Sequence, residues 1–202
     1  MNSKIIRDRT YPKVTILIPN YNGKKWLEKL LPTVEKSTYP NKEILVINNG
    51  STDDSAQFLK KNYPKVRVIE IKKNRGYAGA NNFGIKYAEG KYVLFLNNDT
   101  YVTPNFLEPL VEKMESDKTI GAVQPQIRHM VRKDVIDSIG SFFTFTGFLY
   151  HYGYFQEHRE KKYQKELSVY TVKGACFLMK KKDYIDVGGI DESFVTYIEE
   201  SD

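Results

Sequence analysis

The chain has 202 residues, of which 41% are hydrophobic, and only 8 prolines, which is enough apolar material for the core of one globular domain. It contains no run of eighteen apolar residues, and residues 1–9 are polar and charged without the apolar stretch of a signal peptide, so we expect a cytoplasmic protein. The net charge of +6 favours an anionic partner, but the basic residues are scattered and no nucleic-acid-binding motif accompanies them, which argues against nucleic acid.

Strands and helices are predicted in regular alternation along the first part of the chain. Short apolar or β-branched runs predict strands over residues 14–18, 43–47, 66–71 and 92–96. Apolar positions at helical spacing, or capping residues, predict a helix after each strand: from the residue after Gly23 to Val34, from capping residues 51–54 through Phe58 to Lys61, over residues 76–88, and from Pro104 to Met114. The alternation predicts an α/β fold with a mainly parallel central sheet flanked by helices, in which ligands bind beyond the carboxyl ends of the strands.

The pattern changes past Gly121. Residues 119–123 and 171–179 are predicted strands joined by longer connections, which indicates a small mixed sheet added to the parallel one. Residues 157–165 are densely charged, and we expect them to be disordered. The single cysteine, Cys176, lies in an apolar run and is predicted to be a buried core residue. No linker or repeat divides the chain, so a single domain is expected.

Each of the four predicted strands is followed by a polar loop. The loops span residues 20–23, 48–53, 74–77 and 97–100, and parallel strands bring their carboxyl ends to one edge. Asp99, directly after an apolar strand, suits a hard cation that bridges two phosphates, since Mg²⁺ and Mn²⁺ prefer oxygen ligands. Each asparagine cluster taken singly fits ordinary turn chemistry, and the set of four favours a binding site.

Seven motifs follow one another along the chain, at residues 14–22, 43–53, 74–82, 96–100, 174–178, 187–194 and 197–200. In order and spacing they resemble the motifs of family-2 glycosyltransferases with the GT-A fold. The resemblance implies one GT-A catalytic domain over residues 1–202, with a nucleotide-sugar-binding half at about 10–125 and an acceptor-side half at about 126–202. The 74–82 motif resembles that of rhamnosyltransferase-like members and implies a deoxyhexose donor.

The resemblance also assigns a donor site. It implies that Pro19 and Tyr21 lie against the base and that Asp99 binds Mg²⁺ or Mn²⁺. The implied nucleotide-sugar-binding residues are Pro19, Tyr21, Asn22, Asn48, Asn49, Arg75, Gly76, Asn81, Asn97 and Asn98. Asn48 and Asn97 stand where the family commonly has acidic residues. These departures leave the base-reading contact open and imply a metal site with one protein carboxylate, completed by diphosphate and water.

On the acceptor side the resemblance implies Gly174 and Ala175, and a catalytic base near residue 200. The family's base belongs to a Glu-Asp pair, and Glu200 occupies its place, with Glu199 and Asp191 as neighbours. The alternative interpretation of Glu199, and of Asp202, is an acidic helix start that complements the helix dipole. Family members continue past this point, so we expect a truncated chain.

The aromatic segment 142–155 is not explained by the donor site. Phe148, Tyr150, Tyr152 and Tyr154 alternate as on one face of a strand, and the simplest interpretation is a hairpin packed on the domain. The alternative is an acceptor platform at Tyr150 and Tyr152, or a membrane-facing flap, because amphipathic aromatic rings suit sugar stacking and bilayer interfaces.

The implied function is inverting transfer of a sugar from a nucleoside-diphosphate sugar to a glycan or lipid-linked acceptor, in surface-polysaccharide assembly at the inner face of the membrane. A carboxylate base would deprotonate the acceptor hydroxyl while metal stabilises the leaving diphosphate. One alternative is a sugar-nucleotide-binding domain without catalysis. Another is a nucleotidyltransferase, which would need a Gly-rich basic phosphate loop after the first strand, where residues 21–24 are a poor match.

Overall fold

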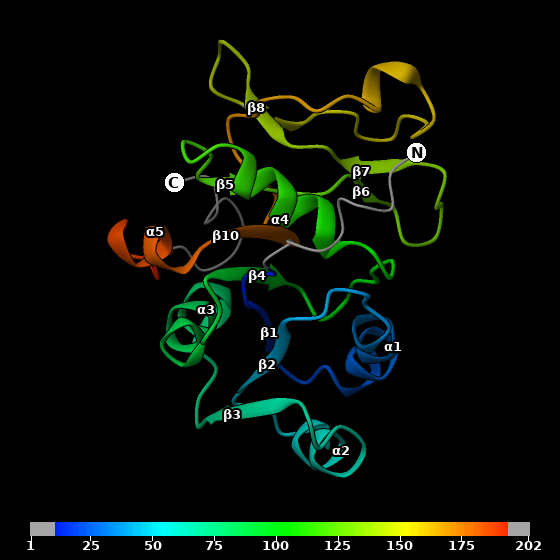
Figure 1. The fold of residues 1–202 in the computed structure, drawn as a ribbon. Helices are drawn as coiled ribbons and strands as arrows, with labels where there is room; N and C mark the ends of the chain where they lie inside the picture. The colour runs from blue at the N-terminus through cyan, green and yellow to red at the C-terminus, as the bar shows by residue number, and fades with distance from the viewer. Residues whose placement is uncertain (1–10, 194–202) are drawn as a thin grey trace, which may run out of the picture.

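A six-stranded sheet organises residues 11–193, the part of the chain that the computed structural model describes (Figure 1). Its strand order is β3-β2-β1-β4-β10-β5, with β1 (Val14–Asn20), β2 (Lys42–Asn49), β3 (Arg67–Ile71), β4 (Tyr92–Leu96), β5 (Ala122–Val123) and β10 (Cys176–Lys180). β1 pairs parallel with β2 and β4, and β2 pairs parallel with β3. β10 runs antiparallel to both of its neighbours. The predicted mainly parallel sheet is confirmed.

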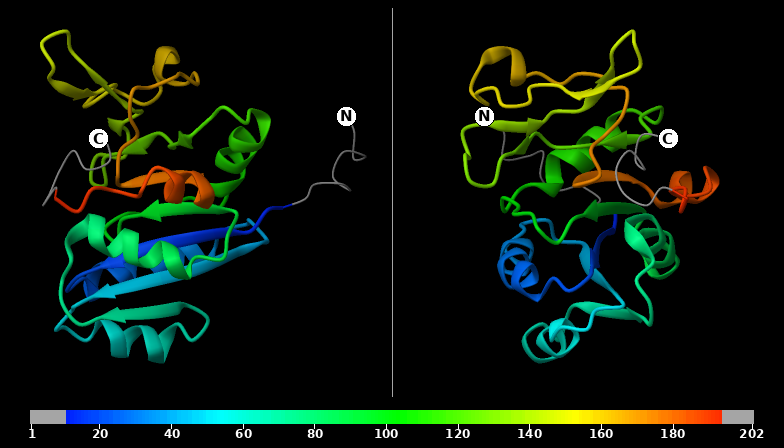
Figure 2. Two further views of the ribbon diagram at one scale, coloured as in Figure 1. Left: turned by 90° about the vertical axis from the view of Figure 1, so that its left-hand side faces the viewer. Right: turned by 180° about the vertical axis from the view of Figure 1, so that it is seen from behind.

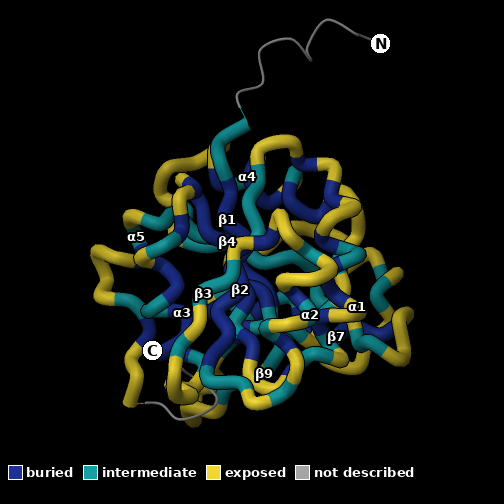
Figure 3. The backbone as a smooth tube through the Cα atoms, turned by 90° about the horizontal axis from the view of Figure 1, so that it is seen from below, coloured by how far each residue is buried: buried dark blue, intermediate teal, exposed yellow. Residues whose placement is uncertain are grey.

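Helices cover both faces of this sheet. One face carries α1 (Lys24–Glu35), α2 (Ser55–Asn62) and α4 (Leu107–Ser116), and the other carries α3 (Gly76–Gly84) and α5 (Lys181–Asp186) (Figure 1). In β1, Ile16 and Ile18 face the first group of helices, whereas Leu17 faces the second. Burial on both faces is why the strands are continuous apolar runs. The buried backbone lies at the centre of the molecule in Figure 3, surrounded by exposed segments.

Two predicted helices have different bounds in the structure. The helix expected over 76–88 ends at Gly84 and continues as a single 3₁₀ turn, η1 (Ile85–Tyr87). The helix expected from Pro104 begins at Leu107. The Pro104 carbonyl accepts hydrogen bonds from the Thr38 N–H at 2.8 Å and from its hydroxyl at 3.1 Å, which hold residues 104–106 in a turn against the end of α1.

The second part of the chain extends the main sheet and adds two hairpins. The strands predicted over 119–123 and 171–179 are β5 and β10, and they complete the six-stranded sheet rather than forming a separate one. The two small sheets are antiparallel pairs, formed by β6 (Ile127–Arg128) with β7 (Ile136–Ser138) and by β8 (Ser141–Phe143) with β9 (Leu149–His151). The β8–β9 pair lies at the end of the molecule opposite to β3 and α2 in Figure 2.

Two expectations about individual segments can be compared with the structure. The expected disorder of residues 157–165 is wrong, because the segment contains the 3₁₀ turn η2 (Lys161–Tyr163). Tyr163 is buried there, with its ring 5.4 Å from that of Tyr152. Cys176 is a buried core residue as predicted, and burial raises the pKa of its thiol to about 12. Between residues 11 and 193, no helix has the length and apolarity needed to cross a membrane.

Candidate functional site

Asn20, the last residue of β1, ties together the loops that follow three parallel strands. Its side-chain N–H donates to Asn48 Oδ1 at 3.3 Å, at the end of β2, and to Ser51 Oγ at 3.4 Å, in the loop that follows β2. Its Oδ1 accepts a 2.8 Å hydrogen bond from Asn98 Nδ2, in the loop after β4. Asn20 and Asn48 are buried, and the bonds to Ser51 and Asn98 are partly buried, so the network holds the loops together with little competition from water. The predicted convergence of the loops at one sheet edge is therefore present.

Gly23 allows this convergence because it leaves room for the two amides. A Cβ atom at Gly23 would lie 2.2 Å from Asn98 Nδ2 and 2.4 Å from Asn20 Oδ1, closer than real Cβ contacts. A glycine is thus required at position 23 by close approach, and α1 begins at the next residue.

Asn22 and Asp53 brace the β1 loop against the β2 loop. Asn22, in the left-handed backbone region at φ 47°, accepts a 2.7 Å hydrogen bond from the Thr52 N–H through its side-chain oxygen. Asp53 accepts from the Lys24 N–H at 3.0 Å and the Ser55 N–H at 3.1 Å, at the starts of α1 and α2. Burial acts to raise the pKa of Asp53, but the hydrogen bonds from Ser55 and Lys24 outweigh it and lower the pKa.

Asn49 connects the β2 edge to the start of α3. Its Nδ2 donates to Asn74 Oδ1 at 2.8 Å and to the Gly76 carbonyl at 3.0 Å, and its Oδ1 accepts from the Arg75 N–H at 2.9 Å. The side chain is buried and its polar groups are used within the protein. Asn49 therefore shapes the loop that presents Arg75, and its predicted contact with the nucleotide sugar stays a prediction. Asn81 is likewise fully buried in α3, with its side-chain oxygen unpartnered among the described residues.

Asp99 is exposed next to Asn98, at the edge where the loops meet. Asn97 is held by its backbone, which donates to the Ala175 carbonyl at 3.0 Å and accepts from the Thr100 hydroxyl at 2.7 Å. Across residues 11–193, no three His, Cys, Asp or Glu side chains gather as a metal cage. Asp99 thus offers one carboxylate to solvent, which fits a hard cation that takes its other ligands from a diphosphate and water.

Tyr21 forms an exposed wall beside these amides. Its side chain is 51% exposed, directly after buried Asn20, and Pro19 is partly buried before it. An exposed ring at the exit of a rigid strand is suited to stack on a planar ligand. The predicted base-facing pair, Pro19 and Tyr21, flanks Asn20, the central residue of the amide network.

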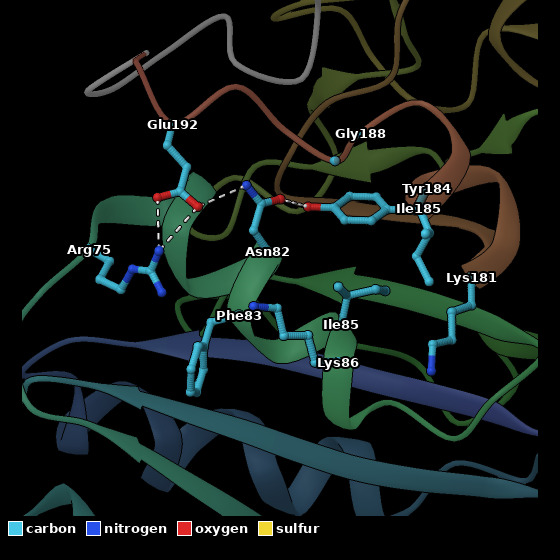
Figure 4. Close-up of a pocket in the computed structure, with 11 residues that line it drawn as sticks. Arg75, Asn82, Phe83, Ile85, Lys86, Lys181, Tyr184, Ile185, Gly188 and Glu192 are labelled. Carbon is cyan, nitrogen blue, oxygen red and sulfur yellow. Dashed lines mark hydrogen bonds and ion pairs between the residues drawn. The ribbon is translucent and has the colours of Figure 1, made fainter.

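Arg75 forms a clamp with Glu192 and Asn82 on the α3 side (Figure 4). The Arg75 guanidinium lies 3.1 Å from Glu192 Oε2, and Asn82 Nδ2 donates to Glu192 Oε1 at 3.2 Å. Asn82 also donates to the Ile190 carbonyl at 2.7 Å and accepts from the Ile190 N–H at 3.0 Å and the Tyr184 hydroxyl at 2.5 Å. The clamp therefore fixes residues 190–192 against α3.

A pocket of about 520 Å³ opens beside the clamp, between α3 and α5 (Figure 4). It is lined by Arg75, Asn82, Phe83, Ile85, Lys86, Lys181, Tyr184, Ile185, Gly188, Gly189 and Glu192. It lies on the α3–α5 face and shares Arg75 with the predicted donor site. The candidate site consists of the loops that follow β1, β2, β3 and β4, here called the loop edge. The pocket adjoins this edge at Arg75.

The predicted acceptor residues fall in two places. Gly174 and Ala175 precede β10 and accept hydrogen bonds from the Tyr77 hydroxyl at 2.8 Å and the Asn97 N–H at 3.0 Å, so they border the donor loops. Tyr150 and Tyr152 lie in and just after β9. Tyr150 is exposed, whereas Tyr152 packs edge-on against Phe142 and Tyr163. The predicted four-residue alternation does not form one strand, since β9 ends at His151.

The predicted catalytic carboxylates are described only in part. Asp191 is exposed and accepts a 2.7 Å hydrogen bond from the Ser193 N–H, which lowers its pKa. Glu199 and Glu200 lie outside the described residues. Sequence reasoning did not single out Asn20, Asp53, Asn82 or Glu192. Asn20 could have been found from its place at a strand end, but the partners of Asn82 are 102 to 110 residues away and leave no local signal.

Residues 15–188 match the family described as glycosyl transferase family 2. Over 122 residues, the chain is 38% identical to an uncharacterized glycosyltransferase of Rickettsia bellii, which covers 59% of this chain and 17% of the relative. Over 188 residues it is 30% identical to the poly-β-1,6-N-acetyl-D-glucosamine synthase of Staphylococcus aureus, covering 91% of this chain and 43% of the synthase. The chain thus spans less than half the length of these curated relatives.

Solved structures show the same fold. The mannosyltransferase PcManGT of Pyrobaculum calidifontis, in complex with GDP-Man and Mn²⁺, aligns with a TM-score of 0.68 at 20% identity, over 95% of this chain and 50% of that one. S. aureus TarS 1–349 in complex with UDP aligns with a TM-score of 0.69 at 19% identity, over 94% and 53%. These similarities establish the GT-A fold.

Proposed function

This chain belongs to glycosyl transferase family 2, and we propose that it transfers a sugar, with inversion, from a nucleoside-diphosphate sugar to a glycan or lipid-linked acceptor. The observation that carries the proposal is the loop edge, where buried Asn20 joins three strand exits and leaves Tyr21 and Asp99 exposed. Ligands of doubly wound sheets bind at this edge. The nucleotides bound in the PcManGT and TarS structures support the same class of donor.

The donor side of the proposal uses the exposed ring of Tyr21 and the amide of Asn48, which is buried at the end of β2. Tyr21 and Pro19 would flank the base. Asn48 accepts from Asn20 through its oxygen, so its own N–H groups would donate to the base or ribose, where a carboxylate could only accept. Arg75 would contribute positive charge. A deoxyhexose donor rests on the 74–82 motif, while the named relatives point to N-acetylglucosamine and mannose.

Asp99 would hold Mg²⁺ or Mn²⁺ together with the donor diphosphate. When bound, the ion would supply positive charge to the departing diphosphate. The protein's own contribution is to place one exposed carboxylate on a loop that Asn98 and Asn97 anchor to neighbouring strands. With a single protein carboxylate, affinity for the ion should depend on the presence of the nucleotide.

Glu200 is proposed as the base that deprotonates the acceptor hydroxyl, with Glu199 and Asp191 nearby. The observation that supports this role concerns residues 190–192, which precede Glu200 in the chain. Asn82 and Arg75 fix residues 190–192 against α3, so the chain leading to Glu200 starts from a defined position beside the donor loops. Gly174, Ala175 and Tyr150 would border the acceptor.

Nucleotide titrations test the donor site. We expect Mn²⁺ to strengthen the binding of at least one of UDP, dTDP and GDP, measured by calorimetry, and Asp99→Asn to remove most of that enhancement. Asp54→Asn is the matched control, because Asp54 is an exposed carboxylate on the β2 loop that pairs with Lys24. Absence of metal-enhanced binding for all three nucleotides would defeat the proposal.

A binding domain without catalysis is the second candidate, and the amides Asn48 and Asn97 in place of acids favour it. Hydrolysis of UDP-GlcNAc, GDP-mannose and dTDP-rhamnose distinguishes the two. An enzyme should hydrolyse its donor slowly, lose this activity in Asp99→Ala, and lose transfer but keep nucleotide binding in Glu200→Gln. Binding without hydrolysis or transfer would support the second candidate. The nucleotidyltransferase alternative is disfavoured by the family match and by the asparagine-rich loop after β1.

A further inference from the structure

We infer that the tip of the β8–β9 hairpin inserts into the surface of a lipid bilayer. The hairpin tip comprises residues 144–148, between Phe143 and Leu149. This inference is independent of the proposed transfer, since it concerns a surface outside the donor loops and its test needs no nucleotide.

The hairpin tip exposes large apolar side chains in an uncharged stretch of sequence. Phe145 is 102% exposed and Phe148 is 74% exposed. From Ser138 to Gln156 the sequence contains no Asp, Glu, Lys or Arg, although 28% of the whole chain is charged. Two protruding phenylalanines in an uncharged segment favour an apolar environment over water.

About half of the backbone polar groups of the hairpin tip are hydrogen-bonded within it. The Thr144 N–H donates to the Phe148 carbonyl at 2.8 Å, and the Phe148 N–H donates to Thr144 Oγ1 at 3.0 Å. The Gly147 N–H donates to the Thr144 carbonyl at 2.9 Å, and the hydroxyls of Thr144 and Thr146 lie 2.9 Å apart. These bonds reduce the number of backbone groups that need water, and so reduce the cost of placing the tip in the headgroup region of a bilayer.

Tyrosines lie behind the tip, at the base of the hairpin. Tyr150 is 47% exposed and stacks on Phe142, and Tyr170 is 66% exposed with its ring 4.7 Å from that of Phe143. Phenylalanine at the tip and tyrosine behind it match the order of depth in a bilayer, where tyrosine sits at the level of the headgroups. This order favours a membrane over a soluble glycan or a protein partner.

The hairpin projects from the same end of the molecule as the carboxyl ends of the parallel strands (Figure 2, left). Docking by the tip would therefore bring the loop edge close to the bilayer surface. The loop edge could then reach an acceptor that is attached to a membrane lipid.

Flotation with vesicles of phosphatidylethanolamine and phosphatidylglycerol tests the inference. We expect the 202-residue chain to float with vesicles and the variant F145S/F148S to bind about tenfold more weakly or worse, because two apolar side chains no longer insert. The control is V131S/V187S, since Val131 and Val187 are 83% and 73% exposed outside the hairpin. Equal binding by the two variants, or no binding by the unchanged chain, would overturn the inference.

A fluorescence reporter gives a second measurement that does not depend on comparing affinities. The chain has one tryptophan, so Phe145→Trp in a Trp26→Phe background reports on the hairpin tip alone. Its emission should shift to the blue when vesicles are added. A shift with soluble oligosaccharide but not with vesicles would instead identify a glycan platform, and a shift on self-association of the protein would identify a contact between copies; either result overturns the inference.

Discussion

Asparagine side chains hold this site together because one amide can donate and accept at the same time. Asn82 makes four such bonds, to Ile190, Glu192 and Tyr184. Asn82→Ala should lower the free energy of unfolding by about 2–3 kcal/mol, because the buried Tyr184 hydroxyl and the Ile190 backbone lose their partner. Urea unfolding measures the change. Asn62→Ala is the control, since Asn62 is exposed and bonds only locally to Phe58; equal losses in both would show that Asn82 is not a special anchor.

Asp53 gives a pH-dependent prediction at the same scale. Its folded-state pKa lies below the ordinary value of 3.8, so its contribution to stability is present above that value and is lost as pH falls through the folded pKa. Asp53→Asn should cost about 1 kcal/mol at pH 7, comparable with loss of a helix cap, and progressively less in acid below pH 4. Urea unfolding of both proteins across this range checks the trend. A difference that grows on acidification would contradict it.

At the scale of elements, Gly23 sets how closely α1 approaches the loop after β4. Gly23→Ala should destabilise the protein by about 1–3 kcal/mol and weaken nucleotide binding, because the new methyl group collides with the Asn20 and Asn98 amides. Gly121→Ala is the matched control, since a Cβ there meets nothing within 4 Å. Thermal unfolding and calorimetry give the two readouts. Equal behaviour of the two variants would mean that the loops can move apart at little cost.

Elements with strong local signals are predicted well from the sequence. The apolar run at β4 is bounded by polar residues on both sides, and the structure has the same bounds. The helix after β4 is predicted to begin three residues too early. Two hydrogen bonds from Thr38 hold Pro104 outside the helix, and Thr38 is too far away in the sequence to leave a local signal. The convergence of the polar loops follows from parallel topology. The hydrogen bonds of buried Asn49 cannot be predicted in this way, because they depend on where Asn74 and Gly76 lie in space.

At the scale of the whole molecule, the two predicted halves share one sheet. β10 pairs with β4 and β5 pairs with β10, and both hydrophobic layers run across this junction through Leu178 and Phe177. We expect one cooperative unfolding transition, with the same midpoint by Trp26 fluorescence, which reports on α1, and by far-ultraviolet circular dichroism. Two separated midpoints would show that the halves unfold independently.

The position of β10 also has a consequence for synthesis on the ribosome. β4 needs β10 to pair its outer edge, yet Cys176 follows Leu96 by 80 residues. At translation speeds of roughly 5–20 residues per second, the nascent chain presents an unpaired, wholly apolar strand for about 4–16 s. Such an edge is a template for pairing with other chains. Slow elongation between the two strands should therefore favour aggregation, and chaperone capture during that interval should favour the native protein.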